Sequence, residues 1–240
     1  MNVDFTDKVV LVTGASAGIG ESTALLFAKL GAKLSLVGRN EANLRAVAAE
    51  CEKQKGVKPL AIVADLGTDE GVEKIAKETL NHFKRLDVLV NNAGISVRTC
   101  IQLADMATFD EVFNVNVRGV YHLTKLLVPE LIEAGGNIVN VSISVFIYLR
   151  CLKQFNCHRT FQVSNIVKRI TGYTEDQYQS WLSSVAPTIP MGEVCQGSDI
   201  AQMIVHLASD NSRLVTGTVV PVDGGMRFTS PGNLFTKQMK

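Results

Sequence analysis

The sequence predicts an α/β protein with a doubly wound parallel sheet, formed as a single domain over residues 1–240. Short apolar runs rich in β-branched residues alternate along the chain with longer segments whose apolar residues recur at helical spacing. A glycine-rich turn joins the first apolar run, Val9–Val12, to the first helical segment, Glu21–Leu30. Strands and helices that alternate in this way form a parallel sheet covered by helices.

The later elements follow the same alternation. Each expected strand is short and apolar, and each expected helix has apolar residues on one face. After Val9–Val12, the expected strands are Lys33–Val37, Lys58–Ala64, Leu86–Val90 and Asn137–Val141. After Glu21–Leu30, the expected helices are Glu41–Lys55, Thr68–Lys84 and Thr108–Glu133.

Composition bounds the class of protein. The 240 residues are 46% hydrophobic and 20% charged, which suffices for one large domain with a buried core. A net charge of +1 argues against a nucleic-acid partner. No apolar run reaches the roughly 18 residues of a membrane span, and residues 1–7 are too short and polar for a signal peptide. We therefore expect a cytoplasmic protein without a membrane partner.

The 5 cysteines are scattered along the chain, and their odd number favours reduced thiols over a disulfide framework. Cys151, Cys157 and His158 lie close together in the sequence. A zinc site would need tighter pairing and a fourth ligand, so plain packing is the better interpretation. We expect no metal site.

The segment Lys8–Gly20, KVVLVTGASAGIG, has the order strand, glycine turn, helix. This order brings the pyrophosphate of a dinucleotide to the free N–H groups at a helix start, and glycines let the backbone approach it. The spacing is G-x-x-x-G-x-G and not G-x-G-x-x-G, so the turn alone also fits a purely structural role. The cofactor-binding residues expected here are Thr13, Gly14, Ser16, Ala17, Gly18, Ile19 and Gly20.

The end of the second expected strand indicates which dinucleotide binds. A carboxylate there would accept hydrogen bonds from the adenosine ribose and repel a 2′-phosphate. The chain has Gly38, Arg39 and Asn40 instead. The guanidinium of Arg39 is a planar cationic fork that suits a phosphate, although an arginine at a strand end can also be merely solvated. The sequence therefore favours NADP over NAD.

Two motifs at strand ends resemble those of the short-chain dehydrogenase/reductase family: TGASAGIG at Thr13–Gly20 and NNAG at Asn91–Gly94. The resemblance implies a Rossmann fold and an NAD(P)-dependent enzyme that transfers hydride between the nicotinamide and a small-molecule carbonyl or secondary alcohol. The glycine–arginine pair points to NADP (NADPH) within this family too. Beyond the first turn, the cofactor contacts expected on this basis are Arg39, Asn40, Asp65, Leu66, Asn92, Ala93, Gly94 and Val115.

Two of the candidate residues have a second interpretation. By resemblance, the carboxylate of Asp65 accepts the exocyclic amine of adenine, yet on physical grounds it could equally cap the next helix. By resemblance, Asn116 is a catalytic-site asparagine whose local backbone distortion holds a water in the proton path, whereas a mid-helix asparagine can also face solvent. We favour the functional interpretation of Asn116 because FNVNVRGV surrounds it.

The resemblance breaks at a divergent segment, residues 145–164. The family has N-I/V-S-S followed by Y-x-x-x-K on a long helix, whereas this chain has NVSIS and then VFIYLRCLKQFNCHRT. Ile143 falls on the position of the catalytic serine, so either Ser142 or Ser144 is expected to replace it. The segment is also too short for a crossover helix, two loops and a returning strand.

Tyr148 is the candidate proton donor of this segment. Residues four apart on a helix are offset by about 40° and therefore share a face, whereas residues five apart are offset by about 140°. Lys153 is five residues from Tyr148 and so does not share a helix face with it. Tyr121 and Lys125 have the family spacing, but they follow Asn116 on a helix that packs in the relatives. We treat that match as coincidental.

The resemblance resumes after the divergent segment, with residues 165–192 expected as a substrate loop, Ser198–Ser209 as the last long helix and Gly217–Gly225 as the final strand and its turn. Two functions remain open: an NADP-dependent oxidoreductase, or a non-catalytic cofactor-binding or unstable chain that lacks the Tyr-Lys helix. Relatives form homo-oligomers through the two long helices that flank the fifth strand. Because one of these is missing, we expect aggregation or altered assembly.

Overall fold

The computed structural model describes residues 3–97, 104–142 and 171–228. Ser144, Tyr148 and the whole divergent segment 145–164 lie outside the described residues. Cys100, Cys151, Cys157 and His158 lie outside them as well.

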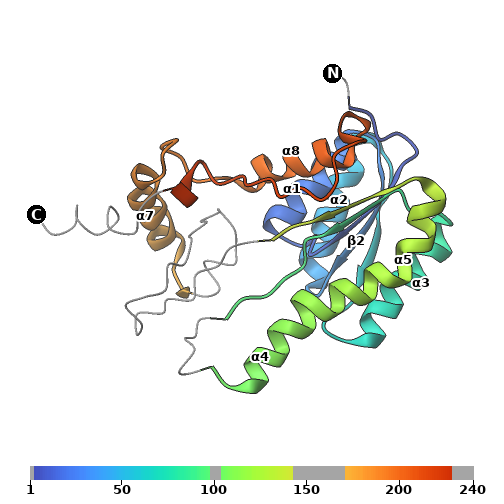
Figure 1. The fold of residues 1–240 in the computed structure, drawn as a ribbon, viewed down its shortest axis with the longest axis horizontal. Helices are drawn as coiled ribbons and strands as arrows, with labels where there is room; N and C mark the ends of the chain where they lie inside the picture. The colour runs from blue at the N-terminus through green and yellow to red at the C-terminus, as the bar shows by residue number, and fades with distance from the viewer. Residues whose placement is uncertain (1–2, 98–103, 143–170, 229–240) are drawn as a thin grey trace, which may run out of the picture.

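Within the described residues, one five-stranded parallel sheet forms the centre of the layered body (Figure 1). Its strands follow the order β3-β2-β1-β4-β5, so β2 and β3 extend the sheet on one side of β1 and β4 and β5 extend it on the other, which reverses the strand order at β1. Doubly wound sheets bind ligands at such a reversal, beyond the carboxyl ends of the strands. The fold class predicted from the sequence is confirmed. The strands are β1 (Val9–Thr13), β2 (Lys33–Gly38), β3 (Leu60–Val63), β4 (Val88–Asn91) and β5 (Asn137–Asn140).

Helices cover both faces of the sheet because its strands are apolar on both sides. Val10 and Val12 point into a core formed with α1, α2 and α8, whereas Val9 and Leu11 point into a core formed with α3 and α5. Successive residues of a strand face opposite ways, so one run of valine and leucine serves both cores. The helices are α1 (Gly18–Lys29), α2 (Glu41–Lys55), α3 (Asp69–Phe83), α4 (Met106–Phe113), α5 (Val120–Ala134), α7 (Glu175–Val185) and α8 (Gly197–Ala208).

The long helix expected over 108–133 is a continuous helical run with a changed centre. A π-helical turn, η1 (Asn114–Gly119), joins α4 to α5. A π-turn accommodates one extra residue in a helix and is common at functional sites. Periodicity alone did not predict it, because the apolar spacing of the segment suits an uninterrupted helix equally well.

The substrate loop expected over 165–192 contains a helix in its described part. α7 begins with a capping box, in which Thr174 accepts from the backbone N–H of Gln177 and Gln177 accepts from that of Thr174. Val185 of α7 packs with Ile189, Val194 and Met226 in a small core of its own, apart from the two cores of the sheet. Figure 1 shows α7 lying to one side of the layered body.

The strand expected within 217–225 is wrong for the described structure, whereas the turn expected after it is present, where the N–H of Gly225 donates to Oδ1 of Asp223. Residues 218–222 have no regular secondary structure, and Val219 is 90% exposed. The β-branched sequence favours an extended chain, but a strand also needs a neighbour for its backbone N–H and C=O groups. Among the described strands, β5 is the last at that edge of the sheet, and none pairs with 217–225.

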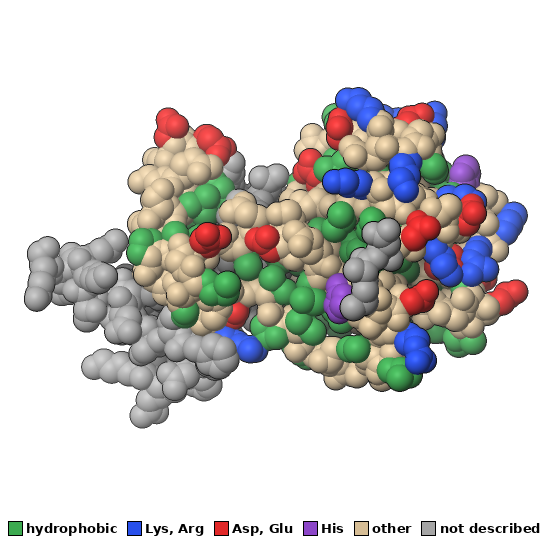
Figure 2. Space-filling view, turned by 90° about the horizontal axis from the view of Figure 1, so that it is seen from above, with side chains coloured by type: hydrophobic (Ala, Val, Ile, Leu, Met, Phe, Trp, Pro, Cys, Tyr) green, Lys and Arg blue, Asp and Glu red, His purple; other side chains and the backbone are tan. Residues whose placement is uncertain are grey.

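Two surface properties bear on possible partners. No helix in the described part of the chain has both the length and the apolar character to cross a membrane. Basic and acidic side chains are interspersed on the face shown in Figure 2. The described part of that face therefore offers no broad basic surface for a nucleic acid.

Candidate functional site

The candidate residues gather at one edge of the sheet because parallel strands all end on the same side. The glycine turn follows β1, Asn92–Gly94 follow β4, and Ser142 follows β5. β1 and β4 are direct neighbours, as are β4 and β5. The three loops therefore adjoin one another beyond the strand ends.

Thr13 and Asn92 tie the first two loops together. The fully buried hydroxyl of Thr13 accepts hydrogen bonds from the backbone N–H groups of Asn92 and Ala93, each at 3.0 Å. In return, Nδ2 of Asn92 donates to the carbonyl oxygens of Thr13, at 2.9 Å, and of Gly14, at 3.3 Å. The side-chain bonds of these two residues lie within the protein, so both residues position the turn.

Two glycines allow the close approach at this turn. Gly14 has a φ of +68°, and a Cβ there would lie 2.9 Å from the Cα of Ala93. A Cβ on Gly20, in the first turn of α1, would collide with the carbonyl oxygen of Gly14. The backbone at both positions is too close to its neighbours for any side chain, which explains the glycines physically.

The start of α1 differs from the starts of the next three helices. Asn40, Thr68 and Asp105 cap α2, α3 and α4, and each accepts a hydrogen bond from a first-turn N–H group. At α1 the N-cap is Ala17, and no side chain caps it. Its first-turn N–H groups thus remain available to an acceptor outside the helix, as a phosphate would be.

Arg39 and Asp65 lie at the carboxyl ends of β2 and β3, with Nη1 of Arg39 3.6 Å from Oδ2 of Asp65. Both side chains are about half exposed, at 52% and 43%. An exposed ion pair of this kind contributes little to stability and leaves the guanidinium available to another anion. Asn40, expected as a cofactor contact, accepts from the N–H of Asn43 at 2.9 Å and so caps α2.

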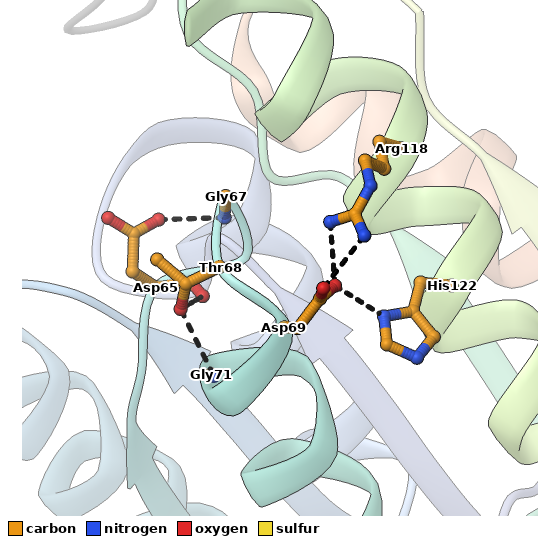
Figure 3. Close-up of polar contacts among 7 residues, drawn as sticks. All are labelled: Asp65, Gly67, Thr68, Asp69, Gly71, Arg118 and His122. Atoms are coloured by element: carbon orange, nitrogen blue, oxygen red, sulfur yellow. Dashed lines mark hydrogen bonds and ion pairs between the residues drawn. The ribbon is translucent and has the colours of Figure 1, made fainter.

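Asp65 does not cap α3, so that interpretation is wrong. Its Oδ1 accepts from the N–H of Gly67 at 2.9 Å, and the cap is Thr68, which accepts from Gly71 at 3.1 Å (Figure 3). The carboxylate of Asp65 is already engaged in the turn at Asp65–Gly67. The hydroxyl of Thr68, the next residue, therefore takes the N-cap position of α3. The carboxylate of Asp65 keeps its second oxygen at the sheet edge.

Asn116 lies in the π-helical turn, and the solvent-facing interpretation is wrong. Its Oδ1 accepts from the N–H of Ile95 at 2.8 Å, and its Nδ2 donates to the carbonyl of the same residue at 2.9 Å. A Cβ on Gly94 would lie 3.3 Å from Oδ1 of Asn116, so the NNAG loop and the π-turn are in contact. The proposed water in a proton path stays a prediction.

Val115 and Leu66 connect the π-turn to the other side of the site. Val115 is 7% exposed, and its Cγ2 would lie 2.9 Å from a Cβ on Gly67. Leu66 is 4% exposed and packs against Gly119 at the end of the turn. The loop after β3 and the π-turn therefore pack backbone to side chain, without room for larger residues at either glycine.

Ser142 lies at the end of β5, and it is the catalytic candidate of that region within the described residues. Asn140, two residues earlier, accepts from Nδ2 of Asn91 at 2.9 Å, and the N–H of Val141 donates to the carbonyl of Asn91 at 2.9 Å. These bonds align the ends of β4 and β5. Ser142 itself is exposed.

The Tyr121–Lys125 pair lies away from the predicted site. Tyr121 is 72% exposed, whereas Leu123 and Leu127 of the same helix are fully buried against the sheet. Residues two apart on a helix point about 200° from each other, so Tyr121 faces solvent. This geometry supports our interpretation that the family spacing of this pair is coincidental.

The sequence patterns do not predict one polar cluster, which consists of Asp69 at the start of α3, Arg118 in the π-turn and His122 in α5. Both carboxylate oxygens of Asp69 accept from Arg118, at 2.6 and 2.7 Å, and Nδ1 of His122 lies 3.0 Å from Oδ1 (Figure 3). These residues are 49 and 53 positions apart, so no local pattern indicates the contact. Within the described ranges, no group of three His, Cys, Asp or Glu side chains could hold a metal ion.

Comparison with known protein families identifies the family to which this chain belongs. The family described as short chain dehydrogenase matches residues 8–146, and the family described as enoyl-(acyl carrier protein) reductase matches residues 165–227. The chain therefore belongs to the short-chain dehydrogenase/reductase family. The divergent segment falls almost entirely between the two matched ranges.

Individual relatives extend over nearly the whole chain. A 3-oxoacyl-(acyl-carrier-protein) reductase of Thermotoga maritima is 32% identical over 91% of this chain and 97% of its own length. The structure of L-sorbose reductase from Gluconobacter frateurii, complexed with NADPH and L-sorbose, is 25% identical, covers 96% of this chain and 100% of its own, and has a TM-score of 0.81. A 3-ketoacyl-(acyl-carrier-protein) reductase from Brucella melitensis, complexed with NADH, is 29% identical, covers 92% and 99%, and has a TM-score of 0.71.

Proposed function

We propose that this chain binds NADP(H) and transfers hydride between its nicotinamide and a small carbonyl compound or secondary alcohol. The observation that carries the proposal is the uncapped start of α1 beneath the glycine turn. The N–H groups there favour a pyrophosphate. The Cβ clashes at Gly14 and Gly20 further support a turn built for close backbone approach.

Arg39 supports the preference for the phosphorylated cofactor. It extends from the end of β2, half exposed, and the strand end carries no carboxylate of its own to repel a 2′-phosphate. Asp65 is close to the guanidinium, and we propose that the arginine turns from this weak partner to the phosphate when NADP(H) binds. One solved relative is complexed with NADPH and another with NADH.

Hydride transfer to a carbonyl also needs side chains that position the substrate and exchange a proton with its oxygen. A bound nicotinamide supplies or accepts the hydride. We propose that the hydroxyl of Ser142 or Ser144 positions the substrate oxygen and that the phenol of Tyr148 exchanges a proton with it. A phenol has an ordinary pKa of about 10, and a neighbouring cation would be needed to lower it. Residues 165–192 are proposed to enclose the substrate.

A second candidate function is a chain that binds the cofactor without turnover, or one that folds poorly. It is favoured by the position of Tyr121 and Lys125, the sole Y-x-x-x-K pair in the sequence, on the solvent side of α5. General acid–base help of this kind contributes about 10²- to 10⁴-fold to a rate. A chain without it would keep the cofactor site and lose most of the activity.

Thermal unfolding of the purified chain, titrated separately with NADPH and NADH, tests the cofactor proposal. A ligand at about 100 times its dissociation constant adds roughly 2.7 kcal/mol to the stability of a folded protein. We expect a shift with NADPH that exceeds the shift with NADH. No shift with either would refute the cofactor site.

Turnover separates the two candidate functions. NADPH oxidation is measured with a panel of ketones, diketones and steroids, on the wild type and on Tyr148→Phe. The oxidoreductase proposal expects turnover that the substitution abolishes, and full activity of Tyr148→Phe would remove this tyrosine from the mechanism. A thermal shift without any turnover would establish the non-catalytic function.

The cysteines bear on the location of the protein. Burial raises the pKa of the Cys51 thiol to about 12, with the nearby carboxylates of Glu50 and Glu21 adding to the effect. A thiol in this state is unreactive. Separately, the odd number of scattered cysteines favours reduced thiols and supports our proposal that the protein is cytoplasmic.

A further inference from the structure

The Asp69 cluster, which comprises Asp69, Arg118 and His122, joins two elements that carry candidate cofactor residues. Asp69 is the first residue of α3, directly after the loop that contains Asp65 and Leu66. Arg118 belongs to the π-turn that contains Val115 and Asn116. The cluster therefore bridges the loop expected at the adenine end of the cofactor and the turn expected near the reacting end.

Two separate elements hold the π-turn. Asn116 binds both backbone groups of Ile95 in the loop after β4, and Arg118 binds both carboxylate oxygens of Asp69 on α3. Ile95 and Asp69 belong to different elements, so these contacts brace the turn between the loop after β4 and the start of α3. α4, which precedes the turn, has no buried residue to fix its rotation.

The contacts of the Asp69 cluster fix the relative position of its side chains more than they stabilise the fold. The side chains of Arg118 and Asp69 are 56% and 46% exposed, and exposed ion pairs contribute little to folding. A bidentate arginine–carboxylate pair nevertheless fixes both distance and orientation. The hydrogen bonds from Arg118 hold the pKa of Asp69 below its ordinary value, so the carboxylate is charged at neutral pH.

We propose that Asp69, Arg118 and His122 are positioning residues that hold the π-turn in register and thereby align Val115 and Asn116 with the cofactor. A π-turn contains one residue more than the α-helix would, and its relaxation to an α-helix would rotate the preceding residues by about 100°. Asn116 would then leave Ile95, and Val115 would leave Gly67. The alignment part of this inference rests on the proposed cofactor site.

Amide hydrogen exchange without cofactor tests the register. Arg118→Met removes the guanidinium group, and Arg118→Lys keeps its charge without the two parallel N–H donors. Asp69→Asn keeps the shape of the carboxylate and removes its charge. The control is Arg45→Met, because Arg45 makes a similar exposed pair with Glu41, through Nε at 2.8 Å and Nη2 at 2.6 Å. Exchange at Ile95 and 114–119 should accelerate about 2- to 30-fold in Arg118→Met. Exchange equal to that of Arg45→Met would overturn the proposal.

Cofactor affinity tests the alignment. We expect the dissociation constant of NADPH to rise about 2- to 30-fold in Arg118→Met and Asp69→Asn, while the unfolding midpoint without cofactor stays within about 4 °C. The double variant should lose no more than the more affected single variant, because Arg118 acts only through its contact with Asp69. Additive losses, or a loss of affinity that merely follows a fall in the midpoint, would overturn it.

The two experiments also separate this inference from the proposed function. If the wild type binds neither NADPH nor NADH, the proposed function and the alignment fail together. The exchange measurement, which uses no cofactor, then still decides whether the cluster holds the π-turn. Faster exchange with unchanged NADPH affinity would overturn the alignment and leave the proposed function intact.

Discussion

The side-chain amide of Asn116 pairs with both backbone groups of Ile95, as a neighbouring strand would. Oδ1 accepts from the N–H at 2.8 Å, and Nδ2 donates to the carbonyl at 2.9 Å. Ile95 follows β4, where the sheet no longer supplies partners for its backbone. One side chain in the π-turn thus extends the order of the sheet edge into the loop beside the candidate site.

Asn116→Leu should destabilise the protein by about 1–3 kcal/mol, because two backbone groups of Ile95 lose their partners. Urea unfolding at neutral pH measures the change. The matched control is Asn114→Leu, at an exposed position of the same turn. Equal losses in the two variants would show that the effect comes from placing a leucine in this turn and not from the lost bonds to Ile95.

Gly14→Ala should cost more stability than Gly56→Ala. Both glycines have a positive φ, of +68° and +72°, and a left-handed backbone costs an ordinary residue about 1–2 kcal/mol. Gly56 has open space around it, whereas a Cβ on Gly14 would press on the backbone of Ala93. Unfolding of both variants measures the difference, and similar costs would contradict the close packing of the turn.

Arg39→Ala should weaken NADPH binding about 10- to 100-fold, since a hydrogen bond to a charged group contributes roughly 1.5–3 kcal/mol. NADH lacks the 2′-phosphate, so its dissociation constant should change little. Isothermal titration with both cofactors measures the ratio, with Arg45→Ala as the control for lost surface charge. Equal weakening of both cofactors would assign Arg39 to a general electrostatic role.

Asp87 should make stability depend on pH in the acid range. Burial raises the pKa of this carboxyl, but hydrogen bonds from Arg85, the N–H of Val9 and Lys8 outweigh burial, so the pKa is lowered overall. The folded-state pKa thus lies below the unfolded value of about 3.9, and the stability that Asp87 contributes is complete above that value and lost as the pH falls through the folded-state pKa.

Unfolding free energies of the wild type and Asp87→Asn, measured from pH 7 down to pH 3, test this sign. We expect the wild type to be more stable by about 1–3 kcal/mol at pH 7 and the difference to shrink in acid. A difference that stays constant over the range would mean that the loss arises from packing alone.

An apolar stripe on α4, the π-turn and α5 should make the chain self-associate. Phe109, Phe113, Val117 and Tyr121 recur every four residues, and each is at least 45% exposed. Exposed apolar surface of this extent favours association. Sedimentation should show aggregated or heterogeneous species that Phe113→Glu reduces, with Leu214→Glu as the control away from the stripe. A clean tetramer of the wild type would contradict the expected disturbance of assembly.

Much of the fold could be predicted because it depends on local patterns. The strand residues of β1 are apolar without alternation, which is typical of a strand buried on both faces, and the structure buries all of them. The bounds predicted for α2 are those observed, since Asn40 caps its start and Gly56, with a φ of +72°, ends it. The glycine turn was equally visible, because φ and close approach constrain the residue type directly.

The candidate site was predictable only in part. Its residues could be named from motifs at strand ends, but the tasks of several side chains could not. Thr13 and Asn92 bind each other's loops, and Asn40 caps a helix. The strand expected at 217–225 was wrong, because extended propensity does not supply a partner strand.

The sequence by itself determined the fold class, the order of most strands and helices, and the edge of the sheet at which the site lies. Tertiary structure alone decided that Asn116 turns to Ile95 and that Arg118 meets Asp69, 49 positions earlier in the chain. The physical reason is range. Propensity, spacing and capping act within a few residues, whereas a hydrogen bond between distant residues exists only after packing has brought their elements together.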